Sequence, residues 1–167
     1  MKNQYRVTKY DPSLRDATGA FAGCDWTSRS DVGSIFNGGT LSEAVYLNVE
    51  NSYLSVMKSF LDEARIESME LTGFERRDAP ADGFLDGANL SVAKSLDFAR
   101  IALREEVWGK LVLPGKAYVH FGHDYYMYIG VPSKCEQSIA IASKLGLFVE
   151  RFRSPYLRQQ LFRAVTR

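Results

Sequence analysis

Apolar side chains recur at helical spacing along residues 41–65. The stripe repeats at intervals of three and four positions: Leu41, Val45, Val49, Tyr53, Val56, Phe60 and Ala64. A stripe of this period predicts an amphipathic helix with one face in the core. Thr40-Leu41-Ser42-Glu43 has the capping-box pattern, in which a hydroxyl and a carboxylate bond the first free backbone amides. We therefore expect a helix from Leu41 to about Arg65, capped by Thr40.

Three further helices are expected. Ser95 is a suitable cap for a helix to about Lys110, with apolar residues over a wide arc. The segment 133–136, Ser-Lys-Cys-Glu, is a second capping box, and Gly146 is well placed to end the helix that follows it. A short basic helix is expected from Pro155 to about Val165.

Alternation of polar and apolar residues predicts the strands. We expect strands at 4–9, 67–73 and 147–152, and two more within 116–131, joined by a tight turn at 122–124. A short extended piece is expected at 89–93. The glycine-rich segment 11–40 is expected to be mostly loop, with one helical turn at 31–36 and with Trp26 packed into the core.

The element order β, α, β, α, β, β, α, β, α predicts an α+β fold. We expect a mixed, mostly antiparallel sheet of about five strands with three or four helices packed mainly on one face. A length of 167 residues with 46% hydrophobic residues fits one domain over residues 1–167. No apolar run approaches the roughly 18 to 20 residues that span a bilayer, and the first residues are polar, so we expect a cytoplasmic protein with no membrane partner.

The common catalytic signatures are absent from the sequence: it has no GxxxxGK[ST], GxGxxG, HExxH or GxSxG motif. Both histidines, His120 and His123, lie in one predicted hairpin. Residues three apart on a regular strand point to opposite faces, and no third ligand is evident, so we expect no metal and no cofactor. One enzymatic alternative stays open, a hydrolase or transferase with a site around His120, His123 and Asp124, assisted by Ser28 or Tyr126.

The predicted hairpin also carries aromatic side chains with polar tips. Tyr126 and Tyr128 fall on the face away from the helices, and Tyr118 and His120 share one side of the partner strand. If the register joins them on one face, the cluster has the composition of a protein interface. A covering helix or the loop 11–40 would instead make it a second core, and the pattern leaves both alternatives open.

Charge is unevenly distributed along the chain. Residues 1–86 carry 14 acids and 9 bases, whereas residues 87–167 carry 6 acids and 12 bases. Within the first part, the segment 62–86 has a net charge of −5 and includes Glu75, Asp78, Asp82 and Asp86. Such a segment can steer a basic partner, although a solvated loop is the plainer explanation. The basic C-terminal run lacks a groove-reading motif, so nucleic acid is not the favoured partner.

Several segments together resemble a bacterial family of immunity proteins, found in polymorphic toxin and contact-dependent growth-inhibition systems. The matching segments are 5–12, 25–28, 30–33, 103–108, 120–130 and 146–150, the fifth reading His-Phe-Gly-His-Asp-Tyr-Tyr-Met-Tyr-Ile-Gly. The resemblance implies a non-enzymatic protein that binds and neutralises a cognate toxin, a nuclease, by blocking its active site or substrate approach. It supplies no catalytic residues.

An acidic patch with aromatic anchors would suit a toxin that is basic around its cleft. The residues expected to contact the toxin combine the aromatic cluster, the hairpin turn and the acidic segment: Tyr118, His120, His123, Asp124, Tyr126, Tyr128, Glu75, Asp78, Asp82 and Asp86.

Overall fold

A seven-stranded antiparallel sheet forms the centre of the fold. The computed structural model describes residues 1–76 and 83–157. The strand order is β5-β4-β6-β7-β8-β1-β9, and every pair is antiparallel. The strands are β1 (Asn3–Thr8), β4 (Ser68–Arg76), β5 (Asn89–Ser91), β6 (Val107–Leu113), β7 (Ala117–Phe121), β8 (Met127–Val131) and β9 (Phe148–Arg151).

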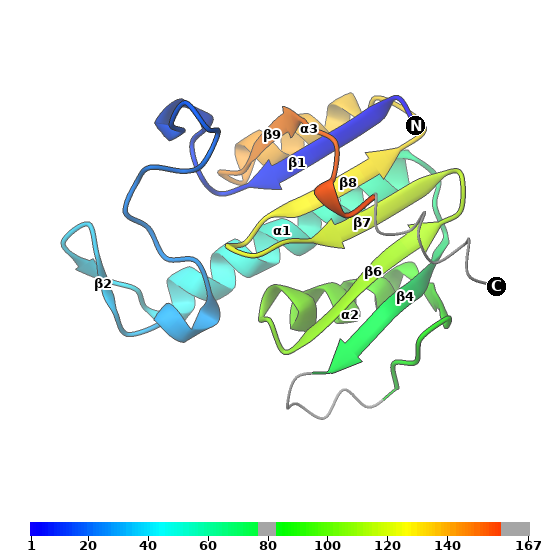
Figure 1. Cartoon of the computed structure of the whole chain (residues 1–167), viewed down its shortest axis with the longest axis horizontal. Coiled ribbons are helices and arrows are strands. Elements are labelled where there is room, and N and C mark those ends of the chain that lie inside the picture. Colours follow the sequence, from blue (N-terminus) through cyan, green and yellow to red (C-terminus); the bar gives the residue numbers. More distant parts are fainter. Residues whose placement is uncertain (77–82, 158–167) are drawn as a thin grey trace.

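The helices lie on one face of this sheet, behind it in Figure 1. They are α1 (Glu43–Glu63), α2 (Val92–Leu103) and α3 (Glu136–Lys144). The predicted α+β class and the placement of helices on one face are therefore confirmed, and the described residues form a single compact domain. The predicted sheet was too small, and no parallel pair occurs among the described strands of the central sheet.

The helix-facing side of the central strands is continuous apolar core. Tyr5, Ile129 and Val119 are cross-strand neighbours on β1, β8 and β7, and all three are buried. Burial of each such side chain contributes roughly 1.5 to 3 kcal/mol. The predicted inward alternation of Met127, Ile129 and Val131 is confirmed.

Helix α1 begins at Glu43, two residues after the predicted start. Its cap is Ser42, whose hydroxyl accepts a hydrogen bond from the Val45 amide at 3.3 Å. Thr40 instead belongs to β3 (Gly39–Thr40), which pairs with β2 (Ile35–Phe36) in a small hairpin. The expected capping box at Thr40 is therefore wrong, because the hairpin takes up Thr40 and the helix begins only after Ser42.

The second predicted helix, expected to reach Lys110, ends at Leu103. Glu105 has a left-handed backbone with φ of 59°, and the amides of Glu105 and Glu106 donate to carbonyls of the last helical turn. These are the bonds of a Schellman motif, which usually places glycine at the left-handed position. The residues after this turn form β6. Because no glycine marks the end of the helix, the sequence pattern predicted neither that end nor the central strand that follows.

Helix α3 uses a cap from a distant part of the chain. The predicted capping box at Ser133 is wrong, because the residue at the cap position is Cys135, with a left-handed φ of 52°. The carboxylate of Glu63 accepts hydrogen bonds from the amides of Gln137 and Ser138, at 3.3 and 2.8 Å. The last turn of α1 thus satisfies the free amides at the start of α3.

Substitution of Glu63 tests this cross-helix cap. Glu63→Gln should lower the free energy of unfolding by about 1 kcal/mol, because the amide group is a weaker acceptor for the α3 backbone. Urea denaturation measures the change. Asp62→Asn is the matched control, since Asp62 pairs with Lys58 at the exposed surface, and it should change stability by less than about 0.5 kcal/mol. Equal effects of the two substitutions would contradict the assigned cap.

The N-terminal loop contains two short 3-10 turns, η1 (Pro12–Leu14) and η2 (Arg29–Asp31). The helical turn expected at 31–36 is therefore misplaced. The Asp31 carboxylate accepts the Thr27 and Ser28 amides and closes the turn earlier. Trp26 is buried against Tyr46 and Tyr125, as expected.

A buried ionic network joins α1 to α2. The Glu50 carboxylate is fully buried and receives two hydrogen bonds from Arg104, at 2.6 and 2.9 Å, and one from Arg100 at 2.8 Å. The Tyr46 hydroxyl adds a fourth. Burial opposes ionisation of this carboxyl, but the arginine contacts outweigh it and hold the pKa of Glu50 below its ordinary value.

The chain after β9 turns back over the sheet. It forms η3 (Pro155–Leu157) and crosses in front of β7 and β8 in Figure 1. The remainder of the helix expected from Pro155 to Val165 lies outside the described residues.

Candidate functional site

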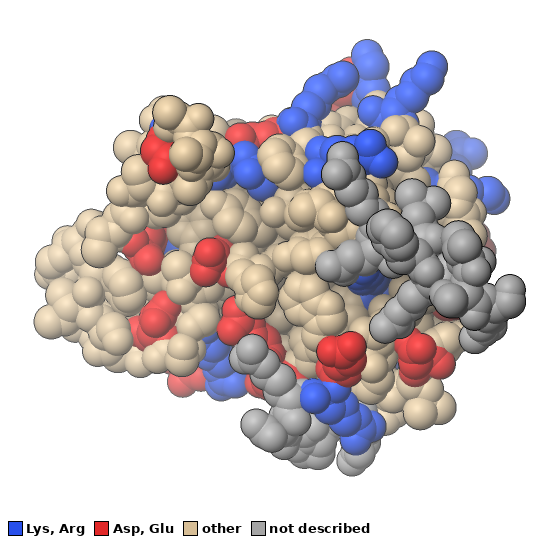
Figure 2. Space-filling view, viewed as in Figure 1, with Lys and Arg blue, Asp and Glu red and all other residues tan. Residues whose placement is uncertain are grey.

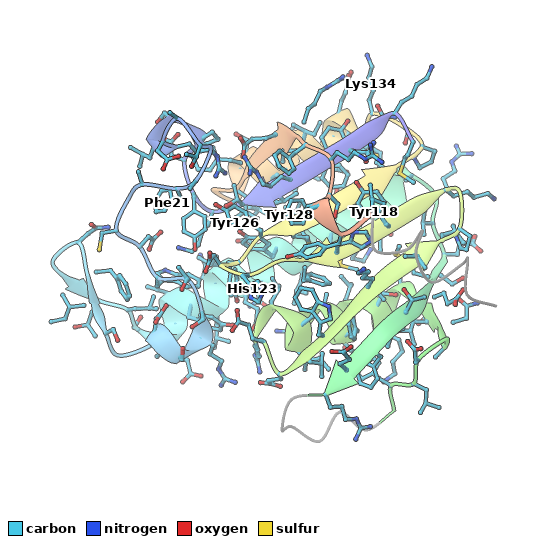
Figure 3. All side chains as sticks on the ribbon, viewed as in Figure 1. Phe21, Tyr118, His123, Tyr126, Tyr128 and Lys134 are labelled. Atoms are coloured by element: carbon cyan, nitrogen blue, oxygen red, sulfur yellow. The ribbon has the colours of Figure 1, made fainter. Side chains whose placement is uncertain are left out.

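Three residues of the predicted aromatic cluster lie together on the sheet face that turns away from the helices. Tyr128 is the cross-strand partner of His120, and Gly130 is that of Tyr118. The rings of Tyr118 and His120 stack with their centres 4.4 Å apart. Figure 3 shows Tyr118 and Tyr128 on the side that faces the viewer. The register, which the sequence left open, therefore joins these three residues on one face. We call Tyr118, His120 and Tyr128 the aromatic face.

The C-terminal strap, residues 152–157, covers the aromatic face. The Ser154 hydroxyl lies 2.8 Å from Nδ1 of His120, and the Lys110 ammonium donates to the carbonyl of Tyr156 at 3.3 Å. The Tyr156 ring packs edge-on against the aromatic face, whose residues are 7% exposed or less. Of the two alternatives, the structure shows a covered second core, and the cover is neither a helix nor the N-terminal loop.

Burial keeps His120 neutral. Loss of hydration, with a smaller contribution from the Lys110 charge, lowers the pKa of His120 to about 3. Its Nε2 atom has no hydrogen-bond partner among the residues that the structure describes. With the strap in place, the three residues of the aromatic face offer no surface to a macromolecular partner.

Tyr126, just before β8, belongs to a charged cluster. Arg15 donates to the Tyr126 hydroxyl at 3.1 Å and to the Glu150 carboxylate at 2.9 Å. Arg6 makes two hydrogen bonds to the same carboxylate, both 3.0 Å long. The guanidinium of Arg6 also lies 4.2 Å from the centre of the Phe152 ring. Tyr126 therefore helps to fasten β1, β9 and the N-terminal loop together, and it is only partly exposed.

An open pocket of about 290 Å³ lies where β4 ends, β6 begins and β7 turns into β8. Its lining includes residues from each of these elements: Glu75, Arg76, Glu105, Trp108, Gly122 and His123. We call it the Trp108 pocket. Two residues expected to bind a partner, Glu75 and His123, are thus brought together by strands that are far apart in the sequence.

Aromatic rings form one side of the Trp108 pocket. His123 is exposed in the β7–β8 turn (Figure 3) and stacks on Trp108, with ring centres 5.7 Å apart and planes at 23°. Tyr156 of the strap packs edge-on against the same indole, at 5.4 Å. These two contacts fix the orientation of the Trp108 ring, which is half-buried.

Two carboxylates also line the pocket, together with Arg76. Glu75 is the cross-strand partner of Trp108, so the two side chains stand next to each other. Glu105 is held at the left-handed turn between α2 and β6. Within the described part of the chain, neither carboxylate has a hydrogen bond or an ion pair. Both groups are therefore available to a cation.

The other residues that were predicted to contact the toxin are four aspartates, and they lie in different places. Asp124 is exposed in the β7–β8 turn, next to His123. Asp86 accepts a hydrogen bond from the Phe74 amide at 2.9 Å, so it fixes the backbone of β4. Asp78 and Asp82 lie outside the described residues.

Charge is segregated in space as well as in sequence. In Figure 2, Lys and Arg gather along the top edge, over β1 and β9, and most Asp and Glu lie over the lower half of the same face. The Trp108 pocket belongs to β4, β6 and the β7–β8 turn, below β1 and β9 in Figure 1. Its described lining has two acids, Glu75 and Glu105, and one base, Arg76, and this net negative charge favours a partner with positive charge.

Sequence reasoning missed Trp108 and Glu105 as candidate binding residues. Both fell inside the helix predicted to reach Lys110, where a tryptophan would be counted with the core. The positive φ of Glu105 has no signal in the sequence, because glycine or asparagine usually occupies such a position.

Comparison of the chain with protein-family models, with curated proteins and with solved structures found no match. The site must therefore be interpreted from its own residues. Within residues 1–76 and 83–157, no group of three or more His, Cys, Asp or Glu side chains is placed to hold a metal ion. The helices of this part of the chain are all too short or too polar to cross a membrane.

Proposed function

We propose that this protein is an immunity protein, which binds a cognate bacterial toxin and blocks its active site or its approach to substrate. The toxin partner is a nuclease domain with a basic surface around its cleft. The observation that carries the proposal is the Trp108 pocket, where two carboxylates without a partner among the described residues lie near the half-buried Trp108 and the exposed His123. Aromatic anchors provide much of the affinity of protein interfaces, and surrounding charges speed association.

The proposed binding surface is the Trp108 pocket and not the aromatic face. Tyr118, His120 and Tyr128 lie under the strap, whereas Trp108 and His123 reach the surface at the end of the same strands. The acidic surroundings explain why a basic protein is preferred over nucleic acid, whose phosphates Glu75 and Glu105 would repel. The sequence resemblance to immunity proteins supports the same function.

Co-expression with bacterial nuclease toxin domains, beginning with any such domain encoded next to this gene, tests the proposal. We expect the protein to protect the cells and to copurify with the toxin domain. Growth arrest together with failure to copurify would overturn the proposal.

A pair of variants then tests the surface. Trp108→Ala should weaken toxin binding at least tenfold, since truncation of a central aromatic anchor commonly removes about 2 kcal/mol or more. Asp62→Asn, which alters an exposed acid that does not line the pocket, should leave the dissociation constant unchanged. Circular dichroism spectra of both variants show whether the fold is kept. Full affinity of a folded Trp108→Ala variant would refute the surface.

The enzymatic alternative around His120, His123 and Asp124 stays a prediction. His120 is buried beneath the strap and bonded to Ser154, whereas His123 is exposed and stacked on Trp108. No observation favours joint chemistry of the two imidazoles over binding.

A further inference from the structure

We infer that the Trp108 pocket is a receptor for a single arginine side chain, presented by the basic partner. The inference rests on the proposed function and deepens it, because it names the chemical group that the pocket holds.

The size of the pocket suits one side chain. A volume of about 290 Å³ is at the lower end of the range for small-molecule sites, which is too small for a large cofactor. The pocket opens at the end of the sheet, where the turn at Gly122 and His123 faces the start of β6.

The aromatic side of the pocket suits a planar cation. Stacked on His123 and braced by Tyr156, the Trp108 indole presents a fixed ring system. Among aromatic side chains, tryptophan forms the strongest cation–π contacts, and a guanidinium can lie flat on its ring. The compact ammonium of lysine has no plane to stack, so arginine is the better fit.

The carboxylates suit the same group. A guanidinium that stacks on Trp108 keeps its N–H donors in the plane of the group, where they can reach carboxylates beside the ring. Glu75 stands beside Trp108 across the β4–β6 pair, and Glu105 lines the same pocket. Arg76 also lines the pocket, and its guanidinium lies 5.8 Å from the centre of the Phe74 ring.

A nucleotide base is the competing occupant, since bases also stack on tryptophan. A nucleotide brings phosphate groups towards Glu75 and Glu105, and like charges repel. The carboxylates therefore favour arginine over a nucleotide, and the experiment includes both.

Nuclear magnetic resonance of the full chain tests the inference without the toxin. The protein has two tryptophans, so its spectrum shows two indole N–H signals, which the Trp108→Phe variant assigns. Titration with Nα-acetyl-arginine amide should shift the Trp108 signal saturably, with a dissociation constant on the order of 1 mM. The signal of Trp26, which is buried in the core, should stay in place and serves as the folding control.

Related compounds show whether the charge and the planar shape of the guanidinium are both needed for binding. The citrulline analogue, which has the same shape without the charge, should bind at least tenfold more weakly, and the lysine analogue should also bind more weakly. The double variant Glu75→Gln/Glu105→Gln should weaken binding of the arginine compound about tenfold or more, whereas Asp62→Asn should leave it unchanged. No saturable shift, equal binding of citrulline or lysine, or preferential binding of adenosine monophosphate would overturn the inference.

The two proposals can fail separately. Binding of the arginine compound without protection from a toxin would overturn the immunity function and keep the arginine pocket. Protection and copurification without any arginine-induced shift of Trp108 would keep the function and overturn the pocket.

Discussion

Replacement of Glu50 with glutamine is expected to lower the free energy of unfolding by about 3 to 5 kcal/mol. The carboxylate is fully buried and accepts hydrogen bonds from Arg104, Arg100 and Tyr46. Glutamine has nearly the same shape but no charge, so the guanidinium of Arg104, with 19% of its side chain exposed, loses its counter-ion. Part of the amide also turns a donor towards the donors of Arg104. Urea denaturation at neutral pH measures the loss.

Two controls isolate the network. Glu43→Gln removes an exposed carboxylate from the same helix and should change stability by less than about 1 kcal/mol. The double variant Glu50→Leu/Arg104→Met removes both charges and should be more stable than Glu50→Gln, because no buried ion is left alone. A loss below about 1 kcal/mol for Glu50→Gln would show that the ionic network does not hold α1 to α2.

Acidification is expected to destabilise the natural chain more than the His120→Asn variant. Between pH 6.5 and 4 the His120 imidazole becomes protonated in the unfolded chain. In the folded chain it stays neutral over this range, because its pKa there is about 3. The unfolded state therefore binds one more proton, and stability falls as the pH falls through this window. The contribution of His120 is about 3 kcal/mol over the window, at about 1.4 kcal/mol for each pH unit.

The measurement compares the dependence of stability on pH, since the substitution itself also changes stability at pH 7. Chemical denaturation at pH 7, 6, 5 and 4 should give a shallower slope for His120→Asn than for the natural chain. Parallel slopes for His120→Asn and the natural chain would contradict a neutral, buried His120.

The elements with strong local signals could be predicted from the sequence. Within the predicted stripe of α1, Tyr53, Val56 and Phe60 are fully buried, but Val45 is 51% exposed. The alternation in β7 and β8 turns one set of side chains towards the helices, and the strap buries the other set as well. The end of α2, the strand β6 and the cap of α3 were not predicted, because they depend on tertiary contacts. Helix α2 ends at Leu103, and the left-handed position after it is Glu105 rather than a glycine, so β6 looked like a continuation of the helix. The cap of α3 comes from Glu63, which lies more than seventy residues earlier.

The candidate site could be predicted only in part, for the same reason. Alternation gave the side of each strand on which Tyr118, His120 and Tyr128 lie, but only the register of β7 with β8 joins them on one face. No local pattern indicates that residues after β9 return to cover it. Glu75 and His123 were proposed from two separate arguments, one on charge and one on composition. Their meeting in one pocket depends on the pairing of β4 with β6 and of β6 with β7, which the alternation does not specify.

Tyr156 has two neighbours of different kinds. Its ring lies edge-on against Trp108 at the pocket and also against Tyr128 beneath the strap. The strap continues directly from β9, the outermost strand of the sheet. A ligand that holds the Trp108 ring therefore also restrains Tyr156, and through it the strap that begins at the edge strand β9. Ligand affinity at the Trp108 pocket should then be thermodynamically linked to local opening of this edge of the sheet.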